Sequence, residues 1–442
     1  MYIPDIFRIV LLIICPLVSL QSQPDTLSLS LEQSVAFALK ENRAVQIAGL
    51  EISKTNYLVH EVLGSFYPKA EITGQYLRNL QRPVIFLPEG SPFGTVLRLG
   101  SDNSYSTNLS LSVPVYSAAL SASVRLARQG MELAGESSRG SKINAAADVR
   151  KAYYNALLAH EAISVIEKAY QNAKENVENI RQMNKQGVVA DYDLIRAEVQ
   201  SENLKPQLEQ AQDNYEFSVN MLKNAIGIPA QQQVLLMDSL TIAGIENNYD
   251  LATALVILQQ QNTNLKQMDL HLKIAGEQTS LSRSARYPYL AAFGNYQVQS
   301  QTNDFKFGEY KWVNTSLVGL QLKFPVFNGF ATNYKIKQNE ITARELSLQK
   351  EMVTEILKVQ LMNIVAKINL AKSRIESQKQ TIALAEKGLS IARVRYHSGA
   401  GTILELNDAE AALMQAKLNY LQTVYDFRIA VTEFEKLTGY GY

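Results

Sequence analysis

The segment KQGVVADYDLIRAE at residues 185–198 returns in altered form as HSGAGTILELNDAE at residues 397–410. The two segments are 397 − 185 = 212 residues apart, and Gly227 and Gly439 are separated by the same 212 residues. A repeated unit of about 210 residues is far longer than the repeats of solenoid proteins. The duplication therefore predicts that one supersecondary unit is used twice in a symmetric assembly.

The 442-residue chain is predicted to have three parts. Residues 1–23 would be a signal peptide, residues 24–246 the first repeat and residues 247–442 the second. In the signal peptide, Arg8 ends a short polar start, an apolar stretch follows, and small residues offer a cleavage site. About nine apolar residues are too few to span a bilayer, and no later segment reaches the ~18 uninterrupted apolar residues of a transmembrane helix. The chain is therefore predicted to be exported, and to cross a membrane only as strands.

Composition and motifs argue against several classes of protein. The 43 Lys and Arg residues nearly balance the 42 Asp and Glu residues, which gives no electrostatic reason to expect a nucleic-acid partner. Cys15 is the only cysteine, and the apolar Ile13 and Ile14 before it disfavour a lipid-acylated cysteine. The 4 histidines show no metal-ligand spacing, and no Gly-rich phosphate loop or GxSxG segment occurs. We therefore expect no cofactor, no bound metal and no enzyme activity.

Each repeat is predicted to begin with a helix, at residues 31–64 and 251–283. Two strands, a very long helix, a Gly-containing turn and a return helix follow in each repeat. The first long helix, at residues 118–182, would measure roughly 100 Å, and its return helix, at residues 193–226, about half of that. The opening helix of the second repeat is the right length to stack on this return helix and complete a column. Pro206 is expected to kink or break the return helix.

The long helices carry an apolar seam with alternating spacings of three and four residues. The second long helix has this seam at Leu361, Ile364, Ile368, Ala371, Ile375, Gln378, Ile382, Ala385, Leu389, Ala392 and Tyr396. The first long helix repeats the register from Val149 to Ile180. Such spacing keeps one seam on one face and drives supercoiling. The pattern therefore predicts long coiled-coil helical hairpins.

Two pairs of strand-like segments alternate between apolar and polar residues. They lie at residues 70–80 and 105–113 in the first repeat and at residues 290–300 and 312–324 in the second. Segments of about 10 residues with one apolar and one polar face are typical of outer-membrane barrel strands, although a soluble hairpin with one buried face gives a similar pattern. Four strands cannot close a barrel, and lipid does not tolerate an open edge. Several chains would therefore share one barrel, with the helical rods forming a hollow column beneath it. The Pro- and Gly-containing segment 81–103 is interpreted as the extracellular loop between the first two strands.

The ordered set of these motifs resembles the TolC-like outer-membrane efflux channels along the mature chain. Residues 29–42, LSLEQSVAFALKEN, are similar to the family's opening pattern LTLEEALxLALxNN. Tyr67-Pro68 and Tyr287-Pro288 lie at the entries from helix to strand, as in the family. Residues 396–409 are similar to the family's YxxGxxTxLDVLDA turn. The resemblance implies a mainly α protein with a membrane β-barrel, in which three chains of four strands each form a twelve-stranded barrel above a periplasmic α-barrel.

The resemblance also implies a function and a location. The protein would be a passive exit duct in the outer membrane of a Gram-negative bacterium, within a tripartite efflux or type I secretion system. Its expected partners are two further copies of the chain, outer-membrane lipid, a periplasmic adaptor and an inner-membrane transporter. The adaptor and the transporter would open the periplasmic tip, while the duct itself performs no chemistry.

Positions in the hairpin turns match residues that act at the tip of the family's channels. By position, Asp193 matches a gating aspartate and Tyr396 a gating tyrosine. Glu405 and Asp408 match an acidic entrance pair, and three copies of such a pair around one constriction would favour cations. Gly401 stands where the family has an arginine that bonds across the closed tip, so other contacts are expected to hold this tip.

Gly187, Gly399, Gly401 and Thr402 are predicted to shape the tip turns and to contact the adaptor. A second interpretation of the acidic pair is open. Thr402 and Glu405 also have the spacing of a capping box, and acidic residues in a first turn complement the helix dipole. On that interpretation the acidic side chains stabilise the helix start instead of lining a pore.

An exported periplasmic coiled-coil scaffold or adaptor without a pore is the main alternative function. The heptad spacing and the near-neutral charge fit this alternative equally well. The two strand pairs, the duplication and the Tyr-Pro junctions do not.

Overall fold

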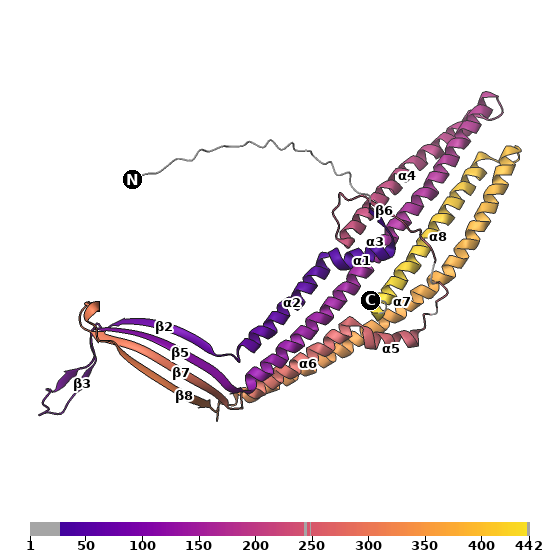
Figure 1. Cartoon of the computed structure of the whole chain (residues 1–442). Coiled ribbons are helices and arrows are strands. Elements are labelled where there is room, and N and C mark those ends of the chain that lie inside the picture. The colour runs from indigo at the N-terminus through magenta and orange to yellow at the C-terminus, as the bar shows by residue number, and fades with distance from the viewer. Residues whose placement is uncertain (1–26, 243–244, 248, 440–442) are drawn as a thin grey trace, which may run out of the picture.

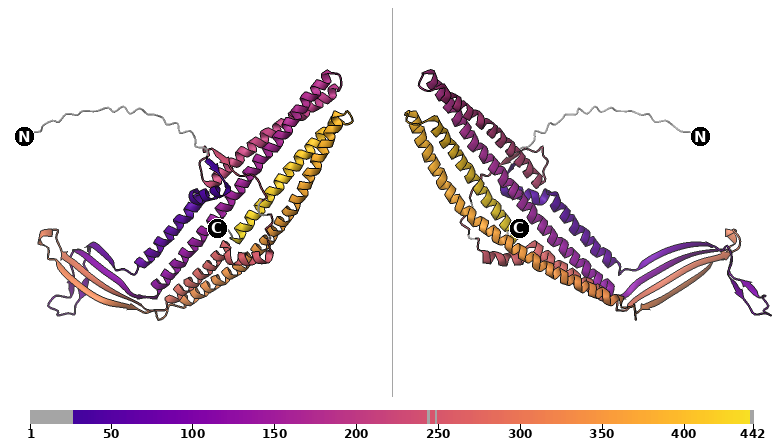
Figure 2. Two further views of the ribbon diagram at one scale, coloured as in Figure 1. Left: turned by 45° about the vertical axis from the view of Figure 1, so that its right-hand side comes forward. Right: turned by 180° about the vertical axis from the view of Figure 1, so that it is seen from behind.

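The computed structural model describes residues 27–242, 245–247 and 249–439. The predicted signal peptide and Cys15 lie outside these residues. The described chain is elongated, with a β-sheet at one end, two helical hairpins at the other end and a helical bundle between them (Figure 1). The two further views in Figure 2 show the same order, with the hairpin tips remote from the sheet.

The order of elements repeats once along the chain. The first set comprises β1 (Leu27–Leu29), α1 (Leu31–Glu41), α2 (Arg43–Gly64), β2 (Lys69–Arg78), β3 (Val84–Phe86), β4 (Val96–Arg98), β5 (Asn103–Ser117), α3 (Ala118–Lys185), α4 (Asp191–Ile226) and β6 (Val234–Leu236). The second set comprises α5 (Leu251–Gln261), α6 (Thr263–Ser284), β7 (Tyr289–Thr302), the 3-10 helix η1 (Phe307–Glu309), β8 (Val313–Lys323), α7 (Ala331–His397) and α8 (Ile403–Thr438). The long helices α3 and α7 contain 68 and 67 residues, so each is about 100 Å long.

Both opening helices are broken at an asparagine, where the sequence predicts one continuous helix. Asn42 separates α1 from α2, and Asn262 separates α5 from α6, each with extended backbone. The side-chain oxygen of Asn42 accepts hydrogen bonds from the N–H groups of Ala44 and Val45 at 2.9 and 3.4 Å. Asn262 caps α6 in the same way. Each asparagine therefore starts a new helix as its N-cap.

The return helices end against these broken junctions. Asn42 Nδ2 donates a hydrogen bond to Ala225 O near the end of α4 at 2.8 Å. Asn262 Nδ2 donates to Leu437 O near the end of α8 at 2.7 Å. One amide in each repeat thus caps one helix and binds the end of another.

The glycine after each return helix allows this close approach. Gly227 has a φ of 92°, and a Cβ there would lie 2.8 Å from Glu41 O. Gly439 has a φ of 68°, and a Cβ there would lie 2.8 Å from Gln261 O.

The prediction that the helix at residues 251–283 stacks on the first return helix is therefore wrong. The end of α4 meets the opening helices of its own repeat, and the end of α8 does likewise.

Pro206 does not break α4, which continues from Asp191 to Ile226 as one helix. A proline has no N–H to donate to the carbonyl four residues earlier, here that of Glu202. Both Pro206 and Glu202 are exposed, so water can hydrate the freed carbonyl. The expected break therefore does not occur.

The four long strands form one antiparallel sheet in the order β2-β5-β7-β8. The register places Ile72 opposite Leu109, and Tyr296 pairs with Leu109 on the other side. Residues that pair in this way lie on one face of the sheet. The register thus confirms the predicted alternation, and the apolar face is open, with Leu109 43% and Val318 89% exposed. The edges β2 and β8 carry no further strand in the described part of the chain.

The segment interpreted as a loop at residues 81–103 contains two short strands. β3 and β4 pair in an antiparallel hairpin, which projects from the end of the sheet that is remote from the helices (Figure 1). The last residue of that segment, Asn103, already belongs to β5.

The helices next to the sheet lie side by side in the order α2-α3-α6-α7. The helices α2 and α7 therefore flank the layer, and each connects to an edge strand. The predicted seam of the hairpins is confirmed, because Leu361, Ile368 and Ile375 of α7 are fully buried. No helix among the described residues has both the length and the apolar character needed to span a bilayer.

Candidate functional site at the hairpin tips

The first hairpin turns between α3 and α4 through a glycine in the left-handed conformation. Gly187 has a φ of 72°, and its N–H donates to Asn184 O at 2.8 Å. The N–H of Val188 donates to Met183 O at 3.0 Å. These bonds satisfy carbonyl groups at the end of α3, as in other glycine-terminated helices. The predicted role of Gly187 in shaping the turn therefore has a local cause in its positive φ.

The second hairpin turns between α7 and α8 through Gly399, which has a φ of 74°. The N–H groups of Ala400 and Gly401 both donate to Arg395 O, at 2.9 and 3.0 Å. A Cβ on Gly401 would lie 3.0 Å from Arg395 Cβ and 3.1 Å from Glu405 Oε2. Gly401 stands where the TolC-like channels carry an arginine, and this position has little room for a side chain.

Only the first half of the predicted capping box is formed in the described structure. Thr402 Oγ1 accepts a hydrogen bond from the N–H of Glu405 at 3.2 Å. The carboxylate of Glu405 lies 3.4 Å from Arg395 Nη2, in an ion pair whose side chains are 46% and 53% exposed. Arg395 thus offsets part of the negative charge that Glu405 brings to the tip. Asp408 is exposed one turn further along α8.

Asp193 lies in the first turn of α4, in the first hairpin, and Tyr396 lies near the end of α7, in the second hairpin. Burial raises the pKa of the Tyr396 phenol, and the nearby Asp193 carboxylate raises this pKa further. The Tyr396 hydroxyl is buried and has no hydrogen-bond partner among the described residues. Tyr396 is therefore held by packing, and no hydrogen bond joins its hydroxyl to Asp193 in the described structure.

Tyr396 packs against an apolar cluster that joins both hairpins. The buried members of this tip cluster are Val177, Ile180, Ala197, Leu389, Ile403 and Leu406. They come from α3, α4, α7 and α8. The apolar seams of the two hairpins thus merge at the tips.

The structure also contains two pairs of charged residues near the tips that no sequence motif had marked. Arg181 Nη2 donates to Glu198 Oε1 at 2.8 Å within the first hairpin. Arg393 Nη2 lies 3.8 Å from Glu410 Oε1 within the second hairpin. The offset of 393 − 181 = 212 residues equals that of Glu198 and Glu410. The repeat itself was therefore the signal that could have found both pairs.

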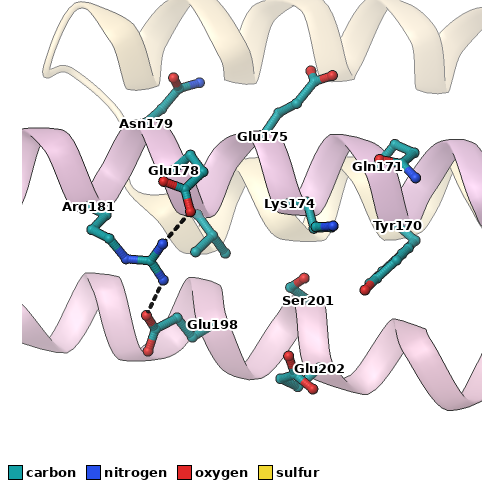
Figure 3. A pocket seen from close by; sticks show the side chains of 11 residues that line it. Tyr170, Gln171, Lys174, Glu175, Glu178, Asn179, Arg181, Glu198, Ser201 and Glu202 are labelled. Atoms are coloured by element: carbon teal, nitrogen blue, oxygen red, sulfur yellow. Dashed lines mark hydrogen bonds and ion pairs between the residues drawn. The ribbon is translucent and has the colours of Figure 1, made fainter.

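A hollow of about 830 Å³ lies between α3 and α4 next to the first pair. Figure 3 shows Arg181 between Glu178 and Glu198, with Lys174 and Ser201 further along the same hollow. Most of the side chains that line it are polar or charged. Among the described residues no group of three or more His, Cys, Asp or Glu side chains is placed to hold a metal ion.

Residues 36–228 and 254–440 match the model of the family described as outer membrane efflux protein. The chain belongs to the outer membrane efflux protein family. This membership confirms the predicted resemblance and the outer-membrane location, and the family itself is one of outer-membrane channels and not of enzymes.

Several characterised proteins are similar to this family member. Outer membrane protein TolC of Vibrio cholerae serotype O1 is 22% identical over 294 residues, which cover 66% of this chain and 66% of TolC. The alignment with TolC of Escherichia coli covers 60% of that protein. The chain thus matches less than two thirds of the length of these relatives.

Solved structures share the fold over a larger part of the chain. The CusC structure superposes with a TM-score of 0.72 at 19% identity, covering 93% of this chain and 92% of CusC. The outer-membrane channel OprN superposes with a TM-score of 0.74 at 15% identity, covering 93% of this chain and 90% of OprN. The predicted fold class, a helical periplasmic barrel joined to a membrane β-barrel, is therefore confirmed.

Proposed function

We propose that this chain is the outer-membrane component of a tripartite export system, and that it forms a passive exit duct. The observation that carries the proposal is the four-stranded sheet with one exposed apolar face and two unpaired edges. Lipid can cover the apolar face, but it cannot satisfy the backbone groups of the edge strands. The edge strands β2 and β8 must therefore pair with further copies of the chain.

Three copies would close a twelve-stranded barrel, and the flanking helices would extend the contact between copies. Exposed apolar residues occur at heptad-like spacing on both flanks. On α2 they are Ile47, Leu50 and Tyr57, and on α7 they are Ile341, Leu348 and Met352. Each of these side chains is more than half exposed in the single chain. Seams of this kind favour helix pairing, which supports a helical tube below the barrel.

The hairpin tips are the proposed entrance of the duct. Glu405 and Asp408 would surround the entrance in three copies and favour cations there. Asp193 and Tyr396 would belong to the gate that separates closed from open tips. Gly187, Gly399, Gly401 and Thr402 would present the turns to a periplasmic adaptor, which links the duct to an inner-membrane transporter.

A membrane extraction experiment tests the duct against the scaffold alternative. Membranes from cells that express the full chain are washed with alkaline carbonate and then extracted with detergent. We expect the protein to remain in the membrane after the wash and to appear in detergent as a trimer by light scattering. Release by carbonate as a monomer or dimer would contradict the barrel and favour an exported coiled-coil scaffold.

A further inference from the structure

Glu410 of α8 is a nearly buried carboxylate close to the hairpin tips. Its side chain is 11% exposed, and Arg393 Nη2 of α7 lies 3.8 Å from Oε1. Asn176 Nδ2 of α3 donates a hydrogen bond to the same oxygen at 3.2 Å. One carboxylate thus joins three helices from two hairpins. Burial of a carboxylate is unfavourable unless partners compensate for the lost water. Asn176 and Arg393 supply that compensation for Glu410.

The residue of the first repeat that corresponds to Glu410 makes no hydrogen bond to the other hairpin in the described structure. Glu198 corresponds to Glu410, and its hydrogen-bond partner Arg181 belongs to the same hairpin (Figure 3). Glu198 is 43% exposed. The position that corresponds to Asn176 in the second repeat, 176 + 212 = 388, is Gly388. The amide donor is therefore specific to one of the two repeats, as is the buried carboxylate that it binds.

Polar contacts between the hairpins occur at two levels in the described part of the chain. At the base, α3 is joined to α8 by the ion pairs Arg150 with Glu435 and Lys151 with Glu433. The contact of Asn176 with Glu410 lies 176 − 151 = 25 residues further along α3, about 38 Å nearer the tip. From there about 14 Å of helix remain to Lys185, where α3 ends. Separation of the tips can therefore leave the base pairs intact, but it must break the contact at Glu410.

We propose that Glu410 is a positioning residue that latches the first hairpin to the second and holds the tip closed. The inference rests on the proposed function as a duct with a periplasmic entrance. Movement of either hairpin would remove Asn176 from Glu410 and leave a poorly hydrated carboxylate without its amide donor. Gly401 has no side chain to bond across the tip, so this latch supplies a link between the hairpins from a different position.

The test uses the full-length trimer and four single variants. Glu410→Ala and Asn176→Ala each remove one partner of the latch. Glu410→Gln keeps an oxygen acceptor for Asn176 and removes the charge. Glu198→Ala is the matched control, because it removes the corresponding carboxylate from a position without a bond between hairpins.

Two readouts are measured for each protein. Single-channel recording in planar bilayers gives the fraction of time in a conducting state, and hydrogen exchange with mass spectrometry reports on residues 173–185 and 397–410. We expect Glu410→Ala and Asn176→Ala to raise the conducting fraction about tenfold, as loss of one buried hydrogen bond implies. Both variants should also exchange faster at the tips. Glu410→Gln and Glu198→Ala should stay close to the wild type in both readouts.

The outcomes separate the latch from the duct. If the wild type conducts and Glu410→Ala behaves like Glu198→Ala in both readouts, the latch is wrong and the duct stands. If no protein conducts but Glu410→Ala and Asn176→Ala speed exchange at the tips, the latch joins the hairpins and the duct proposal fails. An increase for Glu410→Gln equal to that for Glu410→Ala would overturn the role of the hydrogen bond. Should Glu410→Ala not assemble, Asn176→Ala tests the same bond at a half-buried residue.

Discussion

Asn42 donates a hydrogen bond from its side-chain nitrogen to the carbonyl oxygen of Ala225, 183 residues away, at 2.8 Å. Asn262 and Leu437 make the same contact in the second repeat at 2.7 Å. Each bond holds a return helix end-on against an opening helix. The shorter helices of the sheet side and of the tip side are therefore joined through two equivalent amide contacts.

Replacing Asn42 or Asn262 with alanine should destabilise the protein. Each variant loses an N-cap, worth about 1 kcal/mol, and a tertiary hydrogen bond, worth about 1 kcal/mol. Thermal unfolding of the purified trimer, followed by circular dichroism, measures the loss. Asn42→Asp keeps the capping oxygen and loses the donor, so it should fall between Asn42→Ala and the wild type. Equal stability of all three proteins would show that the junction is held by other contacts.

Neighbouring residues on β8 should respond oppositely to a new charge. Leu320 lies on the apolar face and is 70% exposed in the single chain, whereas Gln321 lies on the polar face. An arginine on the lipid face near the middle of a bilayer costs about 2–4 kcal/mol. Leu320→Arg should therefore reduce the amount of trimer assembled in the outer membrane, and Gln321→Arg should not. A reversed order would mean that the apolar face does not contact lipid.

The Tyr396 ring, and not its hydroxyl, is expected to hold the tip. Tyr396→Phe removes a buried hydroxyl that has no hydrogen-bond partner among the described residues, and such a change is close to neutral for stability. Tyr396→Ala leaves a cavity in the tip cluster and should cost about 2 kcal/mol or more. Conductance recordings should show more opening for Tyr396→Ala than for Tyr396→Phe. Equal opening in both variants would point to a hydrogen bond formed by the hydroxyl in the assembled trimer.

Glu410 should make stability depend on pH in a defined direction. Burial raises the pKa of its carboxyl above the ordinary 4.5, and Arg393 and Asn176 oppose this rise only in part. The folded protein therefore binds this proton more tightly than the unfolded chain does. The resulting stability is present below the ordinary pKa and is lost as pH rises through the folded value. Relative to the wild type, Glu410→Gln should gain melting temperature at pH 7, and the gain should shrink as pH falls toward 5.

The measurement is a series of melting temperatures from neutral to mildly acidic pH. Lys168 and Lys417 line a second hollow together with Glu410. Neither lysine is replaced in the variants that are compared. Glu198→Gln controls for loss of a charge at the corresponding position of the first repeat. A difference between Glu410→Gln and the wild type that is independent of pH would contradict the raised pKa.

The sequence predicted the order of elements and the strand faces because both depend on local periodicity. The seam through Leu361 and Ile368 and the alternation around Val318 follow from the spacing of apolar residues alone. The breaks at Asn42 and Asn262 escaped prediction because the apolar pattern continues across them. Each break combines a local N-cap with a tertiary bond to the end of a distant helix, and the apolar pattern reports neither.

The candidate site was predicted in part, for a similar reason. The duplicated turn segments located Gly187, Gly399 and Thr402, whose backbone roles depend on neighbours in sequence. The partners of Glu405 and Glu410 depend on which helices meet in space. Arg395 is ten residues before Glu405, but the bond between Asn176 and Glu410 spans 234 residues. No local pattern encodes such a contact.

Single-channel conductance and ion selectivity of the purified trimer in a planar bilayer test the central claim most directly. The proposed duct predicts a small conductance that prefers cations, with the preference reduced in the Glu405→Ala/Asp408→Ala double variant. Because Arg395 offsets part of the charge of Glu405, Asp408→Ala alone should account for most of the reduction. A stable trimer that inserts into the bilayer and never conducts, even with Glu410→Ala, would contradict the account.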